Sequence, residues 1–117
     1  MRHRKLRHTH CPVEAALDLV GGKWKAVLLT RLETGTLRFG ELRRSVPGIT
    51  QRMLTRQLRE LEADGIVSRK VYRQVPPRVD YALTARGTTL RPVLRALARW
   101  GKAHAPHYSP DEADGVP

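Results

Sequence analysis

A helix, a tight turn and a second helix are predicted by residues 39–64, FGELRRSVPGITQRMLTRQLRELEAD. The turn is expected at Pro47 and Gly48, because proline disfavours helix in the residue before it and glycine accepts a positive φ. Thr50 is a suitable N-cap for the second helix, which we expect over residues 51–64. This order of elements is typical of a helix-turn-helix.

The second helix is predicted to be amphipathic, with a basic outer face. At about 100° of turn per residue, Leu54, Leu58 and Leu61 share one face, which we expect to be buried. The N-terminal half of the opposite face is expected in the major groove of DNA, where arginine reads guanine and glutamine reads adenine. The candidate DNA-binding residues are Thr50, Gln51, Arg52, Thr55 and Arg56, with Arg59 further along the same face. Arginines that pair only with phosphate, or that are simply solvated, are the alternatives.

A β-hairpin is predicted directly after this helix. Residues 66–72 and 79–83 are rich in β-branched residues and alternate as strands do, whereas residues 73–78, RQVPPR, cannot form a central strand and read as the hairpin tip. A helix-turn-helix followed by such a hairpin is the winged arrangement. The candidate wing contacts to an adjacent minor groove are Arg73, Gln74 and Arg78. The expected fold class is therefore α+β, mostly helical, with a winged helix-turn-helix.

Three further helices are predicted around this unit. They are expected over residues 12–20, over residues 23–33, and from the cap Thr84 to about His104 with a kink at Pro92. Residues 36–37 are expected to be a short extended link. The core is expected to include Trp24, Leu28 and Tyr81, and Gly65 is expected to end the helix before the hairpin.

The long last helix is predicted to mediate dimerisation. It follows the wing, where little of the domain core remains to be covered, and it carries a broad apolar stripe. The first helix can supply the rest of the interface. The candidate interface residues are Val13, Leu17, Val20, Leu90, Val93, Leu94, Leu97 and Trp100. The alternative is that the last helix folds back onto its own domain.

Charge and length set the broad class. The 117 residues include 22 lysines and arginines against 11 acidic residues, a formal net charge of +11, which favours a polyanionic partner such as nucleic acid. We expect one domain at residues 11–106, between a basic flexible arm (residues 1–10) and an acidic disordered tail (residues 107–117). One cysteine, no long apolar run and no secretory signal indicate a cytoplasmic location without a membrane partner.

Enzyme chemistry is not expected. Gly21-Gly22 lacks the Gly-Lys-Ser/Thr ending of a phosphate-binding loop, and no paired carboxylates, metal-ligand spacing or cofactor motif is apparent. A metal set of His8, His10 and Cys11 would need a rigid frame, which a basic arm does not supply. The alternative class is a basic nucleic-acid-packing or RNA-binding protein, which would bind without sequence preference and with a steep salt dependence.

Several motifs, in the same order, resemble the HxlR-type family of bacterial winged helix-turn-helix regulators, which are related to the MarR group. They are Cys11-Pro12-Val13, GGKW at residues 21–24, FGEL at 39–42, ITQRMLT at 49–55, LRELEADG at 58–65 and PPRVDYALT at 76–84. The resemblance covers roughly residues 11–104. It implies a homodimeric transcriptional regulator, a repressor or an activator, that binds double-stranded DNA at a palindromic operator and is associated with the bacterial nucleoid.

Cys11 is a candidate sensor residue. It lies at a predicted helix N-terminus, follows a basic run and adjoins His10, and each of these features favours the thiolate. In the family that this chain resembles, a cysteine at this position senses oxidants or electrophiles. With one cysteine, the available products are a disulfide between subunits, a mixed disulfide with a small thiol, or a direct adduct. The alternative is an inert helix cap.

Overall fold

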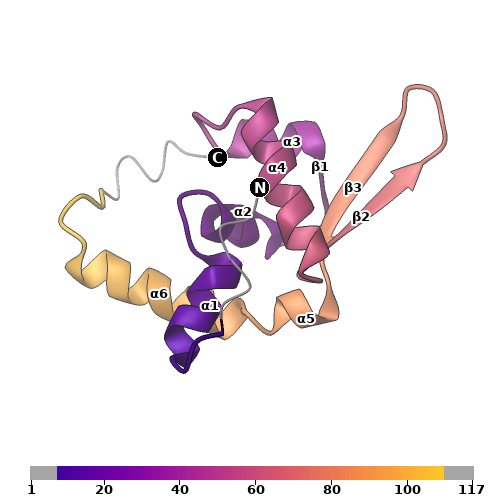
Figure 1. The fold of residues 1–117 in the computed structure, drawn as a ribbon. Coiled ribbons are helices and arrows are strands. Elements are labelled where there is room, and N and C mark those ends of the chain that lie inside the picture. The colour runs from indigo at the N-terminus through magenta and orange to yellow at the C-terminus, as the bar shows by residue number, and fades with distance from the viewer. Residues whose placement is uncertain (1–7, 110–117) are drawn as a thin grey trace.

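The computed structural model describes residues 8–109, which form five larger helices, one short helix and a three-stranded sheet (Figure 1). The elements in chain order are α1 (Pro12–Val20), α2 (Lys25–Leu32), β1 (Leu37–Arg38), α3 (Phe39–Ser45), α4 (Gln51–Ala63), β2 (Val67–Tyr72), β3 (Arg78–Leu83), α5 (Ala85–Thr88) and α6 (Arg91–His104). The predicted class, a mostly helical α+β winged helix-turn-helix, is confirmed. Within the described range, no helix has both the length and the apolar character needed to cross a membrane.

The helix-turn-helix has the local structure that its turn residues predict. Gly48 has a φ of +90° in the turn between α3 and α4. The Thr50 hydroxyl then accepts a hydrogen bond from the Met53 amide at 3.1 Å and caps α4. Gly65, with a φ of +75°, follows the last turn of α4 and lets the chain enter β2. The predicted bounds of α4 are therefore correct to within one residue.

The core lies beneath α4, between α2, α3 and the sheet. Leu54, Leu58 and Leu61 of α4 are at most 1% exposed, which confirms the predicted buried stripe. They pack with Leu28 of α2, which is also fully buried, whereas Trp24 is only partly buried at the edge of the cluster. Burial of these leucines fixes α4 in orientation and leaves its basic face outward.

The sheet contains one strand more than the expected hairpin. The predicted extended link forms β1, which pairs antiparallel with β3 so that Leu37 lies opposite Tyr81. β2 pairs with the other edge of β3, from Val67 opposite Leu83 to Tyr72 opposite Arg78. Arg78 is therefore the first residue of a strand and not part of the hairpin tip. A strand of two residues has no alternating pattern, which is why the sequence shows only a link.

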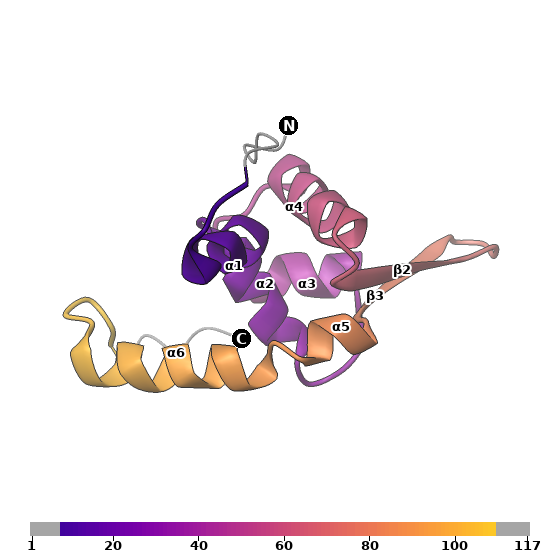
Figure 2. The same cartoon turned by 60° about the horizontal axis from the view of Figure 1, so that its bottom comes forward.

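The expected long last helix is interrupted, and this prediction was wrong. Thr84 caps the short helix α5, accepting a hydrogen bond from the Gly87 amide at 2.9 Å. The chain then turns before α6, where Pro92 lies in the first turn, a position in which proline breaks no hydrogen bond. Pro92 thus starts a helix and does not kink one. Figure 2 shows α6 projecting on the opposite side of the molecule from the wing.

Candidate nucleic-acid interface

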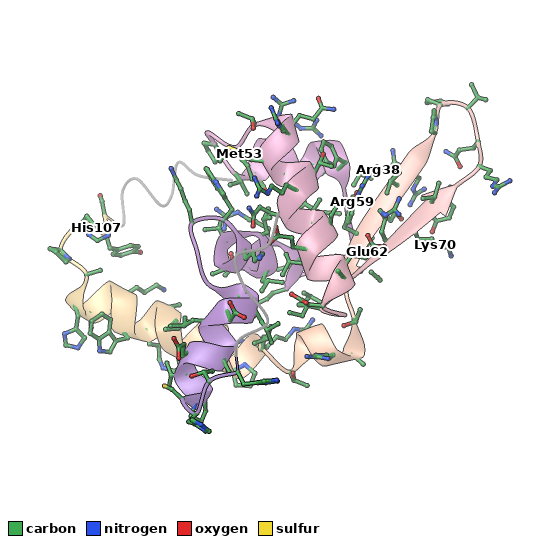
Figure 3. The ribbon with its side chains drawn as sticks, viewed as in Figure 1. Arg38, Met53, Arg59, Glu62, Lys70 and His107 are labelled. Atoms are coloured by element: carbon green, nitrogen blue, oxygen red, sulfur yellow. The ribbon has the colours of Figure 1, made fainter. Side chains whose placement is uncertain are left out.

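The outer face of α4 presents basic side chains to solvent. Arg52, Arg56 and Arg59 are exposed, as is Gln51 in the first turn, while Thr55 is partly buried. Figure 3 shows Arg59 and Glu62 on α4, Lys70 on the neighbouring strand β2 and Met53 nearer the start of the helix. The predicted basic face thus exists, and it is open to solvent in the described part of the chain.

Ion pairs flank this basic face on both sides. Glu60 faces α2 and contacts Lys25 at 2.6 Å, and its second oxygen lies 3.8 Å from Arg56 Nε. Glu62 faces the wing and contacts Arg69 of β2 at 3.2 Å. These pairs could not be predicted from the sequence, because they depend on which elements pack against each flank of α4.

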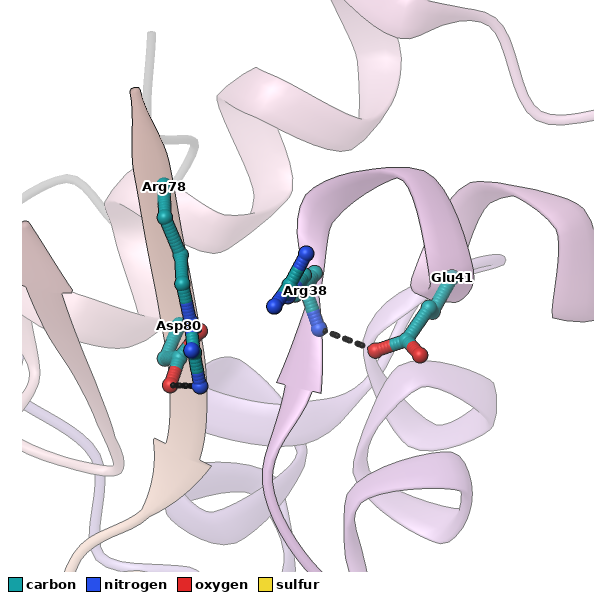
Figure 4. Close-up of polar contacts among 4 residues, drawn as sticks. All are labelled: Arg38, Glu41, Arg78 and Asp80. Carbon is teal, nitrogen blue, oxygen red and sulfur yellow. Dashed lines mark hydrogen bonds and ion pairs between the residues drawn. The ribbon is translucent and has the colours of Figure 1, made fainter. Parts of the chain in front are cut away.

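Only part of the predicted wing contact is an open side chain. Arg73 and Gln74 are exposed in the loop between β2 and β3. Arg78, in contrast, donates two hydrogen bonds of 3.0 Å to the two carboxylate oxygens of Asp80 (Figure 4). Its guanidinium carbon lies 4.7 Å from the centre of the Tyr72 ring. The prediction that Arg78 lies in the hairpin tip was therefore wrong, because it begins β3 and pairs with Asp80.

Asp80 is the centre of a charged cluster on the outer face of the sheet. It is buried at 8% exposure, and it lies opposite Arg38 of β1 and Lys70 of β2 in the strand register. The hydrogen bonds from Arg78 lower the pKa of Asp80, and the charges of Arg38 and Lys70 lower it further. The same contact raises the pKa of Arg78. The i, i+2 spacing of Arg78 and Asp80 was the only sequence signal for this cluster.

Arg38 also begins the helix-turn-helix. Its backbone N–H donates a hydrogen bond of 2.8 Å to the Glu41 carboxylate, so Glu41 caps α3 from within the helix (Figure 4). Arg38 is exposed and stands on the strand next to Asp80. The outer sheet face therefore carries three cationic side chains around one carboxylate, a basic surface that the sequence did not predict.

Cys11 caps α1 and is exposed to solvent. Its Sγ accepts a hydrogen bond from the Glu14 amide at 3.5 Å, and its own N–H donates to Thr9 Oγ1 at 3.1 Å. The Thr9 hydroxyl in turn donates to the Glu14 carboxylate. The predicted helix-start position is correct, but all four lysines and arginines of the basic arm before it lie outside the described residues.

The predicted dimerisation stripe is divided between the subunit core and the surface. Val20 and Leu94 are 8% and 4% exposed and belong to the core of their own subunit, against which Leu90 also packs. Val20 and Leu94 therefore anchor α1 and α6 to their own domain and, contrary to the expectation, offer no open apolar surface. Leu90, directly before α6, is only partly buried and stays a candidate interface residue. The exposed members of the stripe are Val13, Leu17, Val93, Leu97 and Trp100, at 48–67% exposure. α1 and α6 lie away from the wing (Figures 1 and 2).

Comparison with known proteins identifies the family. The model described as HxlR-like helix-turn-helix matches residues 19–109. The HTH-type transcriptional regulator YybR of Bacillus subtilis is 57% identical over 94 residues, which cover 80% of this chain and 75% of that protein. YdeP of the same species is 52% identical over 111 residues, covering 89% of this chain and 87% of that protein.

Solved structures agree with these relatives. The redox regulator HypR in its oxidised form has a TM-score of 0.76 and 57% identity, covering 80% of this chain and 97% of that one. The reduced form of the regulator YodB from B. subtilis has a TM-score of 0.72 and 34% identity, covering 86% of this chain and 100% of that one. The chain therefore belongs to the HxlR-like helix-turn-helix family and is a transcriptional regulator of the HxlR/MarR type, not an enzyme.

Proposed function

We propose that the protein binds a palindromic DNA operator as a homodimer, with α4 in the major groove and the wing in the adjacent minor groove. The observation that carries this proposal is the exposed basic face of α4, opposite a fully buried leucine stripe. Gln51, Arg52, Thr55 and Arg56 supply donors and acceptors for base edges, and Thr50 starts the helix beside them. The exposed tip residues Arg73 and Gln74 suit a narrow minor groove.

Homodimer formation is supported by the exposed part of the apolar stripe. Val13 and Leu17 on α1, with Val93, Leu97 and Trp100 on α6, present large apolar side chains to solvent in the single subunit. Burial of such a patch by a second copy is favourable, and two-fold symmetry matches a palindrome with half-sites about one helical turn, roughly 10 base pairs, apart.

Base reading by α4 is tested with Arg52→Ala and Arg56→Ala. A duplex is selected by the wild-type protein from a randomised pool, and its affinity is compared with that of a shuffled duplex of the same composition. Loss of a base contact costs about tenfold or more on the selected duplex and much less on the shuffled one. Equal losses on both duplexes would assign the arginines to phosphate and favour a protein that packs nucleic acid without sequence preference.

We further propose that oxidants or electrophiles act on the protein through Cys11. The thiol is exposed, and the similar solved structures include HypR, described as a redox regulator, and YodB treated with diamide. Sγ is the acceptor that caps α1, so its modification would weaken the helix turn that carries Val13 and leads to Leu17. Oxidation would thereby reach the proposed dimer surface.

The chemistry with diamide is defined by the single cysteine. Two Cys11 thiols, one from each subunit, lose two protons and two electrons in total and form a disulfide. The N=N bond of diamide takes up the two protons and two electrons and becomes a hydrazine. Diamide should change the affinity for the selected duplex, and Cys11→Ser should abolish the change. Non-reducing electrophoresis and mass spectrometry distinguish the intersubunit disulfide from a mixed disulfide or an adduct. A response that persists in Cys11→Ser would overturn the sensor role.

A further inference from the structure

Glu60 of α4 lies between two cations of different exposure. Its Oε1 accepts a hydrogen bond from Lys25 Nζ at 2.6 Å, and its Oε2 lies 3.8 Å from Arg56 Nε. The side chains of Lys25 and Glu60 are only 10% and 14% exposed, whereas that of Arg56 is 52% exposed. One carboxylate thus joins a buried lysine of α2 to an arginine on the outer face of α4.

The buried lysine fixes the carboxylate in place. Separating the two groups would leave an unpaired charge in a poorly hydrated site, which is costly, so Glu60 is held against α2. Its remaining oxygen points one helical turn back, toward Arg56. At 3.8 Å this contact is an ion pair longer than a hydrogen bond, so it attracts the guanidinium without removing it from solvent.

A fixed negative charge at this position affects the two kinds of DNA contact differently. A flexible arginine can pair with any phosphate, and such pairing carries no sequence information. The Glu60 carboxylate repels phosphate oxygens that approach its side of α4 and restricts the directions available to Arg56. Because the Arg56 side chain is already restricted before DNA binds, it loses less conformational entropy when it makes one defined contact.

We propose that Glu60, anchored by Lys25, is a positioning residue that directs Arg56 toward a base edge and so raises sequence discrimination. The proposal rests on the proposed DNA-reading role of α4. It assigns to Glu60 no contact with DNA; Glu60 acts through Arg56. It also gives the buried lysine, which no part of the proposed function uses, a role in specificity.

The helix supplies a matched control in Glu62. This residue also lies on α4 and also pairs with a basic side chain, Arg69 of β2, at 3.2 Å. It faces the wing, whereas Glu60 lies beside Lys25 of α2 and Arg56. Glu60→Gln and Glu62→Gln therefore make the same change in charge on the same helix, and only Glu60→Gln removes the carboxylate beside Arg56.

The experiment measures Kd for the selected duplex and for the shuffled duplex by fluorescence anisotropy, at several salt concentrations. Glu60→Gln is expected to bind the shuffled duplex more tightly and to lose roughly tenfold in the ratio of the two affinities. Glu62→Gln is expected to bind both duplexes more tightly and to keep the ratio of the two affinities unchanged. In an Arg56→Ala background, Glu60→Gln is expected to change the ratio no further, because the residue that it positions is absent.

A second variant removes both buried charges and keeps the net charge unchanged. Lys25→Gln/Glu60→Gln places two amides that can pair with each other, so folding does not depend on an unpaired charge. Its ratio of affinities for the selected and the shuffled duplex is expected to fall by the same factor as in Glu60→Gln. Three outcomes would each overturn the positioning role. One is a wild-type affinity ratio in this double variant, and another is an affinity ratio in Glu60→Gln equal to that in Glu62→Gln. The third is that Glu60→Gln lowers the affinity ratio by the same factor in the Arg56→Ala background. If the wild-type protein selects no sequence at all, the proposed function itself is overturned, and the positioning role with it.

Discussion

Asp80 is the residue on which the outer face of the wing depends. A hairpin of two strands is marginally stable by itself, so contacts between side chains on its faces add to its order. The two hydrogen bonds from Arg78 and the placement of the guanidinium over Tyr72 join the ends of both strands at the base of the loop. The wing therefore presents Arg73 and Gln74 from a braced hairpin.

We predict that Asp80→Asn lowers the melting temperature by a few degrees at neutral pH, because the amide cannot accept both hydrogen bonds from the charged guanidinium. The pKa of Asp80 in the folded protein is lowered below its ordinary value of 3.8 by Arg78. The contribution to stability is thus complete above that ordinary value and is lost as the pH falls through the lowered one. Melting curves followed by circular dichroism across this range check the prediction.

The sign of the pH dependence separates this ion pair from a packing effect. The difference between wild type and Asp80→Asn should shrink in acid, since the wild-type carboxyl is then protonated as well. Arg78→Lys, which keeps the charge but loses the planar fork, should lie between the two at neutral pH. A difference that stays constant into acid would show that shape at position 80, and not charge, stabilises the wing.

At the scale of the element, capping residues and faces were predictable, and long-range pairing was not. Thr50 and Gly65 predicted the ends of α4 because helix ends depend on groups within a few residues. The strand β1 was missed because its two residues acquire their structure only by pairing with β3. The basic face of α4 was predictable from that helix alone, while the roles of Asp80 and Glu60 depend on neighbours distant in sequence.

The break between α5 and α6 has a cause that the apolar pattern hides. Gly87 is buried against the backbone just before β2, where an added Cβ would lie 2.2 Å from the Ile66 carbonyl oxygen. Thr84, the N-cap of α5, joins the helix to the same segment, because its hydroxyl donates a hydrogen bond to the Gly65 carbonyl at 2.6 Å. α5 is thus fixed to the start of the wing, and the chain must turn before α6 can begin.

We predict that Gly87→Ala destabilises the domain by about 2 kcal/mol or more, since the added methyl meets backbone that cannot move without disturbing the sheet. Gly40→Ala in α3 is the matched control. There the nearest atom to an added Cβ is the end of the Arg44 side chain at 3.3 Å, and the better helix propensity of alanine adds up to about 1 kcal/mol. Urea denaturation of both variants gives the two free energies, and an equal effect of the two substitutions would contradict the close approach at Gly87.

The whole molecule separates its two proposed surfaces. The wing and the end of α6 project in opposite directions, so the basic face and the exposed apolar residues do not compete for one partner (Figure 2). The apolar period of α6 was evident from sequence, but its division was not, because only the packing of the helix shows that Leu94 faces inward and Leu97 outward. The core therefore takes the beginning of α6, and its remaining apolar length is available to a second subunit.

We predict that Leu97→Glu converts the protein to monomers. The side chain is 56% exposed in the single subunit, so glutamate there costs the fold little, but it places a charge in the proposed apolar interface, where desolvation is costly. Val71→Glu on β2, at 53% exposure and outside the patch, is the matched control and should leave the oligomeric state unchanged. Sedimentation velocity measures the oligomeric state of both variants. The monomer should also bind a palindrome no better than a single half-site, because the advantage of two linked half-sites is lost. A dimeric Leu97→Glu would move the interface away from α6.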